Sequence, residues 1–174
     1  SSLLDRFTNA RPKIAPYPFT TKIPNLGVLT RDDRDVILAD IPGIIEGASD
    51  GAGLGIRFLK HISRTAALAF LIDLSDEGYA DAFRVLLGEL EAFSPELSKK
   101  RRVIIGTKLD LPETEGRLEE LKDSLPGEEL YGISVFSSQG LDELSAVFLR
   151  MVAEAEAAEE ASRPTDSWGE AWPT

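Results

Sequence analysis

Apolar positions follow two different patterns along the chain. Short, continuous apolar runs are typical of strands covered on both faces of a sheet, and apolar residues spaced three or four apart are typical of amphipathic helices. Strands that alternate with helices predict crossover connections and a mostly parallel sheet. The strands are expected at residues 66–72, 103–106 and 131–135, and the helices at residues 79–93, 118–125 and 140–157.

The first forty residues have a different pattern. Leu3, Leu4 and Phe7 share one helical face, so the chain is expected to begin within a helix. Residues 10–25 contain four prolines, which lack a backbone donor and predict a loop. Two short apolar runs then flank a charged stretch, and this arrangement predicts a β-hairpin. Its strands are expected at residues 27–30 and 36–39.

Composition narrows the class of protein. The chain has 174 residues, which is enough for one domain and a tail, and we place the domain at residues 1–157 and a loosely ordered acidic tail at 158–174. The net charge of −11 disfavours direct DNA binding. The chain has no cysteine and one histidine, His61, so a thiolate or imidazole metal centre is not expected. No apolar run is long enough to span a membrane, and a cytoplasmic protein is expected.

The candidate chemistry follows the predicted strands, because ligands of doubly wound sheets bind at the carboxyl ends of the strands. Asp40 follows the second hairpin strand and is three residues before Gly43, so a magnesium-bound water and a phosphate could meet there. Lys108 and Asp110 follow an apolar strand. A carboxylate at that position can accept both N–H groups on one edge of guanine, which adenine does not offer.

Two further positions complete the pattern. Ser134 ends the last predicted strand and can present backbone N–H groups to a base carbonyl, and Thr20 and Thr21 lie in the proline-rich loop, where a hydroxyl can bind Mg²⁺. For each short motif taken alone, an ordinary turn explains the residues about as well as a nucleotide-binding role does. Their order and spacing together are the layout of a GTP-binding domain.

Two alternatives remain open. Gly51, Gly53 and Gly55 precede residues 56–65, whose apolar spacing predicts a helix, and Asp73 ends a strand about 20 residues later, as in a dinucleotide-binding enzyme. The third glycine of that fingerprint should stand at position 56, which is isoleucine. The other alternative is a non-catalytic interaction domain with a degenerate GTPase fold.

Longer strings resemble the Obg family of GTPases, over nearly the whole chain up to Ala157. Residues 9–21 (NARPKIAPYPFTT) resemble the first switch region of that family, and residues 40–48 (DIPGIIEGA) resemble its second switch. The resemblance implies an α/β fold, a three-layer sandwich around a mostly parallel sheet, as in the P-loop NTPase G domain of small GTPases. It also implies a GTP-binding and GTP-hydrolysing switch that acts in assembly of the large ribosomal subunit.

The resemblance also implies roles for single residues. Thr21 would bind Mg²⁺ and sense the γ-phosphate, the Gly43 N–H would meet the same phosphate, and Asp40 would hold the magnesium water shell. Thr107, Lys108 and Asp110 would contact guanine, with Ser134 over its carbonyl. Where this chain has Thr107, family members usually have asparagine, and where it has Val135 they usually have alanine. The other expected nucleotide-binding residues of these motifs are Ser1, Phe19, Thr20, Ile41, Pro42 and Val135, of which Ser1 would also bind Mg²⁺.

One part of the family pattern is missing from the sequence. None of the 14 glycines is followed by lysine, so the phosphate loop G-x-x-x-x-G-K-[ST] is absent. Ser1 resembles the serine directly after that lysine, and the first strand, the phosphate loop and the glycine-rich N-terminal domain of the family would lie upstream. We therefore expect this chain alone to hold phosphates poorly and to be inactive. Ile44 stands where Ras-type GTPases have a water-orienting glutamine, so intrinsic hydrolysis is expected to be slow.

Overall fold

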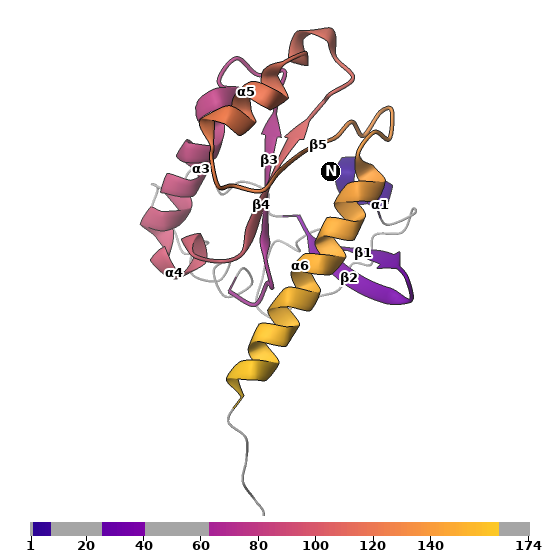
Figure 1. Cartoon of the computed structure of the whole chain (residues 1–174), viewed down its shortest axis with the longest axis vertical. Helices are drawn as coiled ribbons and strands as arrows, with labels where there is room; N and C mark the ends of the chain where they lie inside the picture. The colour runs from indigo at the N-terminus through magenta and orange to yellow at the C-terminus, as the bar shows by residue number, and fades with distance from the viewer. Residues whose placement is uncertain (1, 8–25, 41–62, 164–174) are drawn as a thin grey trace, which may run out of the picture.

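The computed structural model describes residues 2–7, 26–40 and 63–163, and Figure 1 shows their arrangement. They form an α/β structure in which a parallel sheet is covered by helices on both faces. In chain order the elements are α1 (Ser2–Phe7), β1 (Leu26–Arg31), β2 (Arg34–Ala39), β3 (Leu68–Asp73), α3 (Tyr79–Phe93), α4 (Pro95–Ser98), β4 (Arg102–Thr107), the 3₁₀ turn η1 (Pro112–Thr114), α5 (Arg117–Ser124), β5 (Leu130–Gly132) and α6 (Leu141–Ser162).

The described strands form two sheets. β3, β4 and β5 form a parallel sheet in that order, with β4 in the middle. β1 and β2 form an antiparallel hairpin whose two turn residues, Asp32 and Asp33, have φ angles of 52° and 57°. Positive φ at both turn residues is typical of the tight hairpin turn whose twist matches that of the flanking strands.

The core has two layers, one on each face of β4. Val103 and Ile105 point to the face covered by α6, while Ile104 points to the face covered by α3 and α5. All three side chains are fully buried. This alternation follows from the two-residue period of a strand, and it explains why the run is apolar throughout. The result is the expected three-layer sandwich (Figure 1).

The face under α6 also receives the hairpin and the first helix. Leu29 and Val36 of the hairpin belong to the same buried cluster as the apolar face of α6. The rings of Phe7 and Phe148 pack with their centroids 5.7 Å apart, which joins α1 to α6. Arg31 adds a polar connection, because its guanidinium lies 2.7 Å from Asp142 in the first turn of α6.

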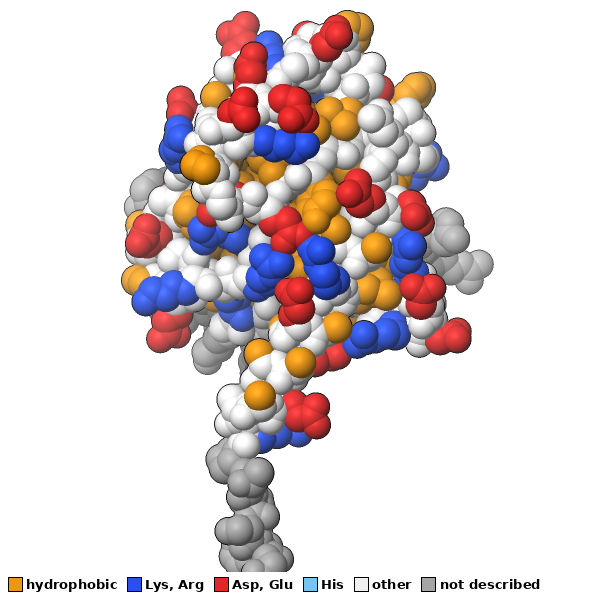
Figure 2. Space-filling view, in the orientation of Figure 1, with side chains coloured by type: hydrophobic (Ala, Val, Ile, Leu, Met, Phe, Trp, Pro, Cys, Tyr) orange, Lys and Arg blue, Asp and Glu red, His pale blue; other side chains and the backbone are white. Residues whose placement is uncertain are grey.

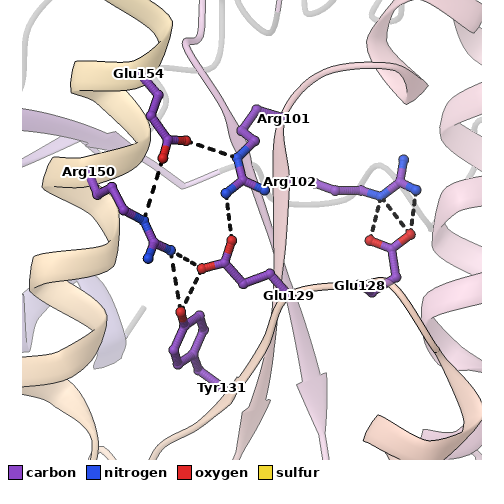
Figure 3. A network of polar contacts seen from close by, with 7 residues as sticks. All are labelled: Arg101, Arg102, Glu128, Glu129, Tyr131, Arg150 and Glu154. Atoms are coloured by element: carbon purple, nitrogen blue, oxygen red, sulfur yellow. Dashed lines mark hydrogen bonds and ion pairs between the residues drawn. The ribbon is translucent and has the colours of Figure 1, made fainter.

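At the amino ends of the strands, an ion-pair network connects the sheet to α6 (Figure 3). Arg101, just before β4, donates hydrogen bonds to Glu129 at 2.6 Å and to Glu154 of α6 at 3.3 Å. Arg150 of α6 also bonds to Glu129, and the Tyr131 hydroxyl donates to the same carboxylate at 2.6 Å. Arg150 also lies 3.8 Å from Glu154, so each of the two acids pairs with two arginines, and this network fixes α6 relative to β4 and β5.

Several predicted elements are confirmed. The helix at residues 79–93 has the expected bounds, and the strand expected at 103–106 is one residue longer at each end. The hairpin lies where its apolar runs placed it, as does the helical turn that carries Leu4.

Three expectations about extent are wrong. The strand expected at 131–135 ends at Gly132, because the chain turns away at Ser134. The strand expected at 66–72 begins at Leu68, and it is not covered on both faces: Ala69 is exposed and Leu71 is 45% exposed. The helix expected at 140–157 continues to Ser162, so the proposed start of a loose tail at 158 falls inside α6. Alanine and glutamate favour helix, and they fill this stretch.

The chain is tightly packed where Gly140 meets the end of β5. A Cβ there would lie 2.3 Å from the backbone carbonyl oxygen of Gly132, and its φ is +73°. Gly116 has a φ of +80° at the equivalent position before α5, with nothing within 4 Å. Gly140→Ala should therefore lower the free energy of unfolding by about 2–4 kcal/mol, from backbone strain and steric overlap together. Urea denaturation followed by circular dichroism measures this change.

Gly116→Ala is the matched control, because it introduces the same left-handed backbone strain without the overlap. It should cost about 1–2 kcal/mol. Equal losses in the two variants would contradict the close contact between Gly140 and Gly132.

Candidate functional site

The carboxyl ends of the three parallel strands form one edge of the sheet. Asp73 at the end of β3 is in register with Thr107 at the end of β4, and Gly106 of β4 is in register with Gly132 of β5. The segments that follow the three strands therefore leave the sheet side by side (Figure 1). The residues expected from the sequence to contact guanine lie on two of these segments, after β4 and after β5.

Asp110 and Ser134 join the segments after β4 and β5. The buried Ser134 hydroxyl donates to the Asp110 carboxylate at 2.5 Å, and the Ser137 N–H donates to the Ser134 hydroxyl at 3.0 Å. The backbone is tied as well, since the Leu109 N–H donates to the Ile133 carbonyl at 3.1 Å. Asp110 itself stays exposed. A carboxylate is thus fixed at one oxygen and remains accessible at the edge of the sheet.

Lys108 adopts a strained backbone and reaches toward the segment after β3. Its φ is 66°, a left-handed conformation that is uncommon for residues other than glycine and often occurs at functional sites. The buried Thr114 hydroxyl donates to the Leu111 carbonyl at 2.7 Å and lies 3.1 Å from the Lys108 carbonyl, which shares the same hydrogen. The Lys108 ammonium lies 2.6 Å from the Asp73 carboxylate and 3.2 Å from the Ser75 hydroxyl. The aliphatic part of the lysine is therefore held across this edge.

The Asp73–Lys108 pair shifts both pKa values toward the charged forms. Burial by itself would raise the pKa of Asp73, but hydrogen bonds from Lys108 and Ser75 outweigh it and hold that pKa below its ordinary value. The hydrogen bond to Asp73 raises the pKa of Lys108, although desolvation opposes the shift. Both residues thus remain charged at neutral pH, and the lysine is anchored by an ion pair.

The loop after β5 was expected to present backbone N–H groups to a base carbonyl. The N–H of Ser134 itself donates to the Gln139 carbonyl at 3.0 Å. Among the described residues, nothing accepts a hydrogen bond from the next N–H, that of Val135. The Val135 carbonyl accepts from Arg6 of α1 at 3.1 Å. The N–H groups of Phe136 and Ser138 likewise have no acceptor among the described residues, and that of Val135 is the nearest of the three to Ser134 in sequence.

Thr107 contacts the neighbouring strand. Its hydroxyl donates to the Ile72 carbonyl of β3 at 3.3 Å, so the side chain bridges β4 and β3. This contact stabilises the strand end that carries Lys108. Contact between Thr107 and a guanine base stays a prediction.

The remaining expected residues concern the phosphates and the metal. Asp40 is described and directly follows β2. Within residues 2–7, 26–40 and 63–163, no three acidic or histidine side chains gather closely enough to hold a metal ion. One carboxylate fits Mg²⁺ only where phosphate oxygens and waters supply the other ligands. The other expected residues lie outside the described ranges: Ser1, Phe19, Thr20, Thr21, Ile41, Pro42 and Gly43.

The sequence reasoning missed several residues that shape this edge. Asp73 was noted only for the dinucleotide-binding alternative, although a carboxylate that ends a strand beside β4 is a signal for a partner of Lys108. Thr114 and Ser75 support Lys108, and Arg6 binds the loop after β5 through Val135 and, at 2.8 Å, through the Ser138 hydroxyl. Arg6 lies about 130 residues away in sequence, and no local pattern predicts its contact.

The opposite edge of the sheet carries the basic run at residues 99–102, beside a surface hollow of about 570 Å³. Its arginines are paired with acids, since Arg102 forms a two-oxygen pair with Glu128 at 2.5–3.2 Å and Arg101 binds Glu129. Figure 2 shows charged side chains of both signs interspersed on the face of the molecule that it presents. Arg101 and Arg102 therefore belong to the ion pairs that hold the structure together.

Comparison with known structures supports the fold. The cytosolic domain of the T. maritima FeoB iron transporter in a GDP form matches 94% of this chain and 59% of that chain, with a TM-score of 0.63 and 21% identity. The putative nucleolar GTP-binding protein 1 from Plasmodium falciparum matches 92% of this chain and 83% of that one, with a TM-score of 0.62 and 13% identity. The fold is that of the P-loop GTPase G domain, as expected. No described helix is long and apolar enough to cross a membrane.

Sequence comparison identifies the family. Residues 1–108 match the family model described as 50S ribosome-binding GTPase. GTPase Obg of Treponema denticola is 60% identical over 171 residues, 98% of this chain and 45% of that protein. GTPase Obg of Borreliella burgdorferi is 49% identical over 148 residues, 85% of this chain and 45% of that protein. The chain thus spans less than half the length of these curated relatives. It belongs to the 50S ribosome-binding GTPase family and, within it, to the Obg GTPases.

Proposed function

We propose that the protein carrying this chain binds guanine nucleotides at the carboxyl edge of the sheet and hydrolyses GTP slowly, as a molecular switch. The observation that carries the proposal is the bond between Ser134 and the exposed Asp110, which fixes a carboxylate between the segments after β4 and β5. Membership of a GTPase family supports the same reading.

The donor and acceptor positions of this edge match guanine. One edge of guanine offers two parallel N–H donors, and the Asp110 carboxylate can accept both. The Val135 N–H can donate to the carbonyl of the same base. The aliphatic stem of Lys108, anchored on Asp73, can lie over the ring. Adenine presents neither the paired donors nor the carbonyl, so this arrangement discriminates between the two purines.

The phosphate end of the proposed site rests on sequence motifs. We assign Thr21 and Gly43 to sensing of the γ-phosphate, and Ser1 and Thr21 to direct binding of Mg²⁺, with Asp40 acting through a water. Mg²⁺ in such sites neutralises charge on the β- and γ-phosphate oxygens. A loop that is ordered by the γ-phosphate and released after hydrolysis is the usual basis of a GTPase switch.

A role at the ribosome completes the proposal. The matched family is described as ribosome-binding, and we propose that the protein acts in assembly of the large ribosomal subunit in the cytoplasm. Charges of both signs are interspersed on the face seen in Figure 2. We therefore expect specific contacts to place the protein on the ribosome, since that face offers no broad basic surface for RNA.

Asp110→Asn tests base recognition. The amide replaces one acceptor by a donor, so it repels an N–H of guanine and suits the second carbonyl of xanthine. Binding of fluorescent GDP should weaken by at least about 100-fold, while binding of xanthosine diphosphate improves. Competition by GTP, ATP and xanthosine diphosphate measures the change. The titration should be run on this chain and on a longer one that includes the residues before Ser1.

Asp123→Asn is the control, because Asp123 is an exposed aspartate on α5, away from the edge. It should leave GDP binding unchanged. Displacement of GDP by ATP as readily as by GTP, in the unsubstituted protein, would contradict the assignment of Asp110. Absence of GDP binding by both forms of the protein would favour a non-catalytic interaction domain.

Intrinsic hydrolysis should be slow, because isoleucine at position 44 cannot orient the attacking water. We expect a single-turnover rate on the order of 10⁻³ s⁻¹ or less in the longer chain without a partner, as in GTPases that lack a supplied arginine. Phosphate release from bound GTP measures it. A rate of about 1 s⁻¹ or more without a partner would show that the chain itself positions the water.

A further inference from the structure

Phe136 is a large apolar side chain held in solvent next to the proposed base site. Its side chain is 87% exposed, the highest value among the exposed large hydrophobic residues of the described chain. Single exposed hydrophobic residues are common on protein surfaces, so exposure by itself decides nothing. The position of Phe136 is what matters, because it lies two residues after Ser134, whose hydroxyl is bonded to Asp110.

The loop that carries Phe136 is fixed on both sides. Before it, the Val135 carbonyl accepts a hydrogen bond from Arg6 at 3.1 Å. After it, the Ser137 N–H donates to the Ser134 hydroxyl at 3.0 Å, and the Ser138 hydroxyl accepts from Arg6 at 2.8 Å. With its neighbours bonded in this way, the loop presents the ring of Phe136 at a defined place.

That place lies within reach of a base bound at Asp110. Ser134 is bonded to Asp110, and two residues of chain span at most roughly 7 Å. A phenylalanine ring at that distance can meet the face of a purine whose edge is held by the carboxylate. Lys108 comes from the other segment, after β4, and its stem is apolar. The two segments thus bring one apolar surface each to the same site.

We propose that Phe136 stacks on the base of the bound guanine nucleotide, and that it raises affinity without selecting the base. This inference rests on the proposed function and adds a residue to the same site. Stacking on an aromatic ring is tolerant of base identity, since every base has a π-face. Selection stays with Asp110, and Phe136 shields the base from water.

The substitution Phe136→Ala tests the proposal. It should be made in this chain or in the longer one, depending on which of the two binds GDP when unsubstituted. We expect the dissociation constant for GDP to rise by about 5- to 150-fold, the range that corresponds to base–aromatic stacking. The dissociation constant for inosine diphosphate should rise by the same factor, so the ratio of the two constants stays unchanged. Phe136→Tyr keeps an aromatic ring and should retain the affinity.

A spectroscopic readout separates stacking from a structural effect. Phe136→Trp should show a change in tryptophan emission when GDP is added, beyond any change in the unsubstituted protein, whose tryptophans are Trp168 and Trp172. Val85→Ala is the matched control, because Val85 is 54% exposed on α3. It should leave the dissociation constant for GDP unchanged, and thermal melting should show that all four variants are folded.

The two proposals fail in different ways. If the unsubstituted protein binds GDP and Phe136→Ala binds it equally well, the stacking proposal is wrong and the proposed function stands. A changed ratio between inosine and guanosine diphosphates would also overturn it, since Phe136 would then select the base. If no form of the unsubstituted protein binds GDP, the proposed function fails, and the role of Phe136 fails with it.

Discussion

The ends of β4 and β5 lie close to α5 because each strand has a glycine there, Gly106 in β4 and Gly132 in β5. A Cβ on Gly132 would come within 2.5 Å of Leu118 of α5 and 2.7 Å of Leu109, and one on Gly106 would come within 2.9 Å of Leu118. Leu118 therefore fills the space that both strands leave open. The segments after the strands begin from this close contact, so the separation of Lys108, Asp110 and Ser134 depends on it.

Local sequence patterns were enough for most of the fold. The three-to-four-residue spacing gave the bounds of α3, and two apolar runs around a charged turn gave the hairpin. The buried run of β4 was recognisable because each of its faces meets a different layer of the core. The positions of Lys108 and Asp110 followed from the rule that polar residues just after parallel strands meet at one edge.

Contacts between distant segments could not be predicted in this way. The pairing of Lys108 with Asp73 depends on the register of β3 with β4, and the bond from Arg6 to Val135 depends on how α1 packs. The direction of a small polar group is also set by its surroundings. The Thr107 hydroxyl donates to β3, and the Ser134 N–H donates to Gln139, and neither partner could be read from the motif alone.

The length of α6 has a mechanical consequence. The helix begins directly after the loop that carries Phe136, packs on the core as far as Met151 and Val152, and then continues to Ser162 with mostly exposed side chains. Its 22 residues make a rod of roughly 33 Å. A tilt of about 5° at its first turn would displace its far end by about 3 Å, at the helical rise per residue. Because the ion-pair network and the core hold α6 on β4 and β5, such a tilt would require the helix and the two strands to move together.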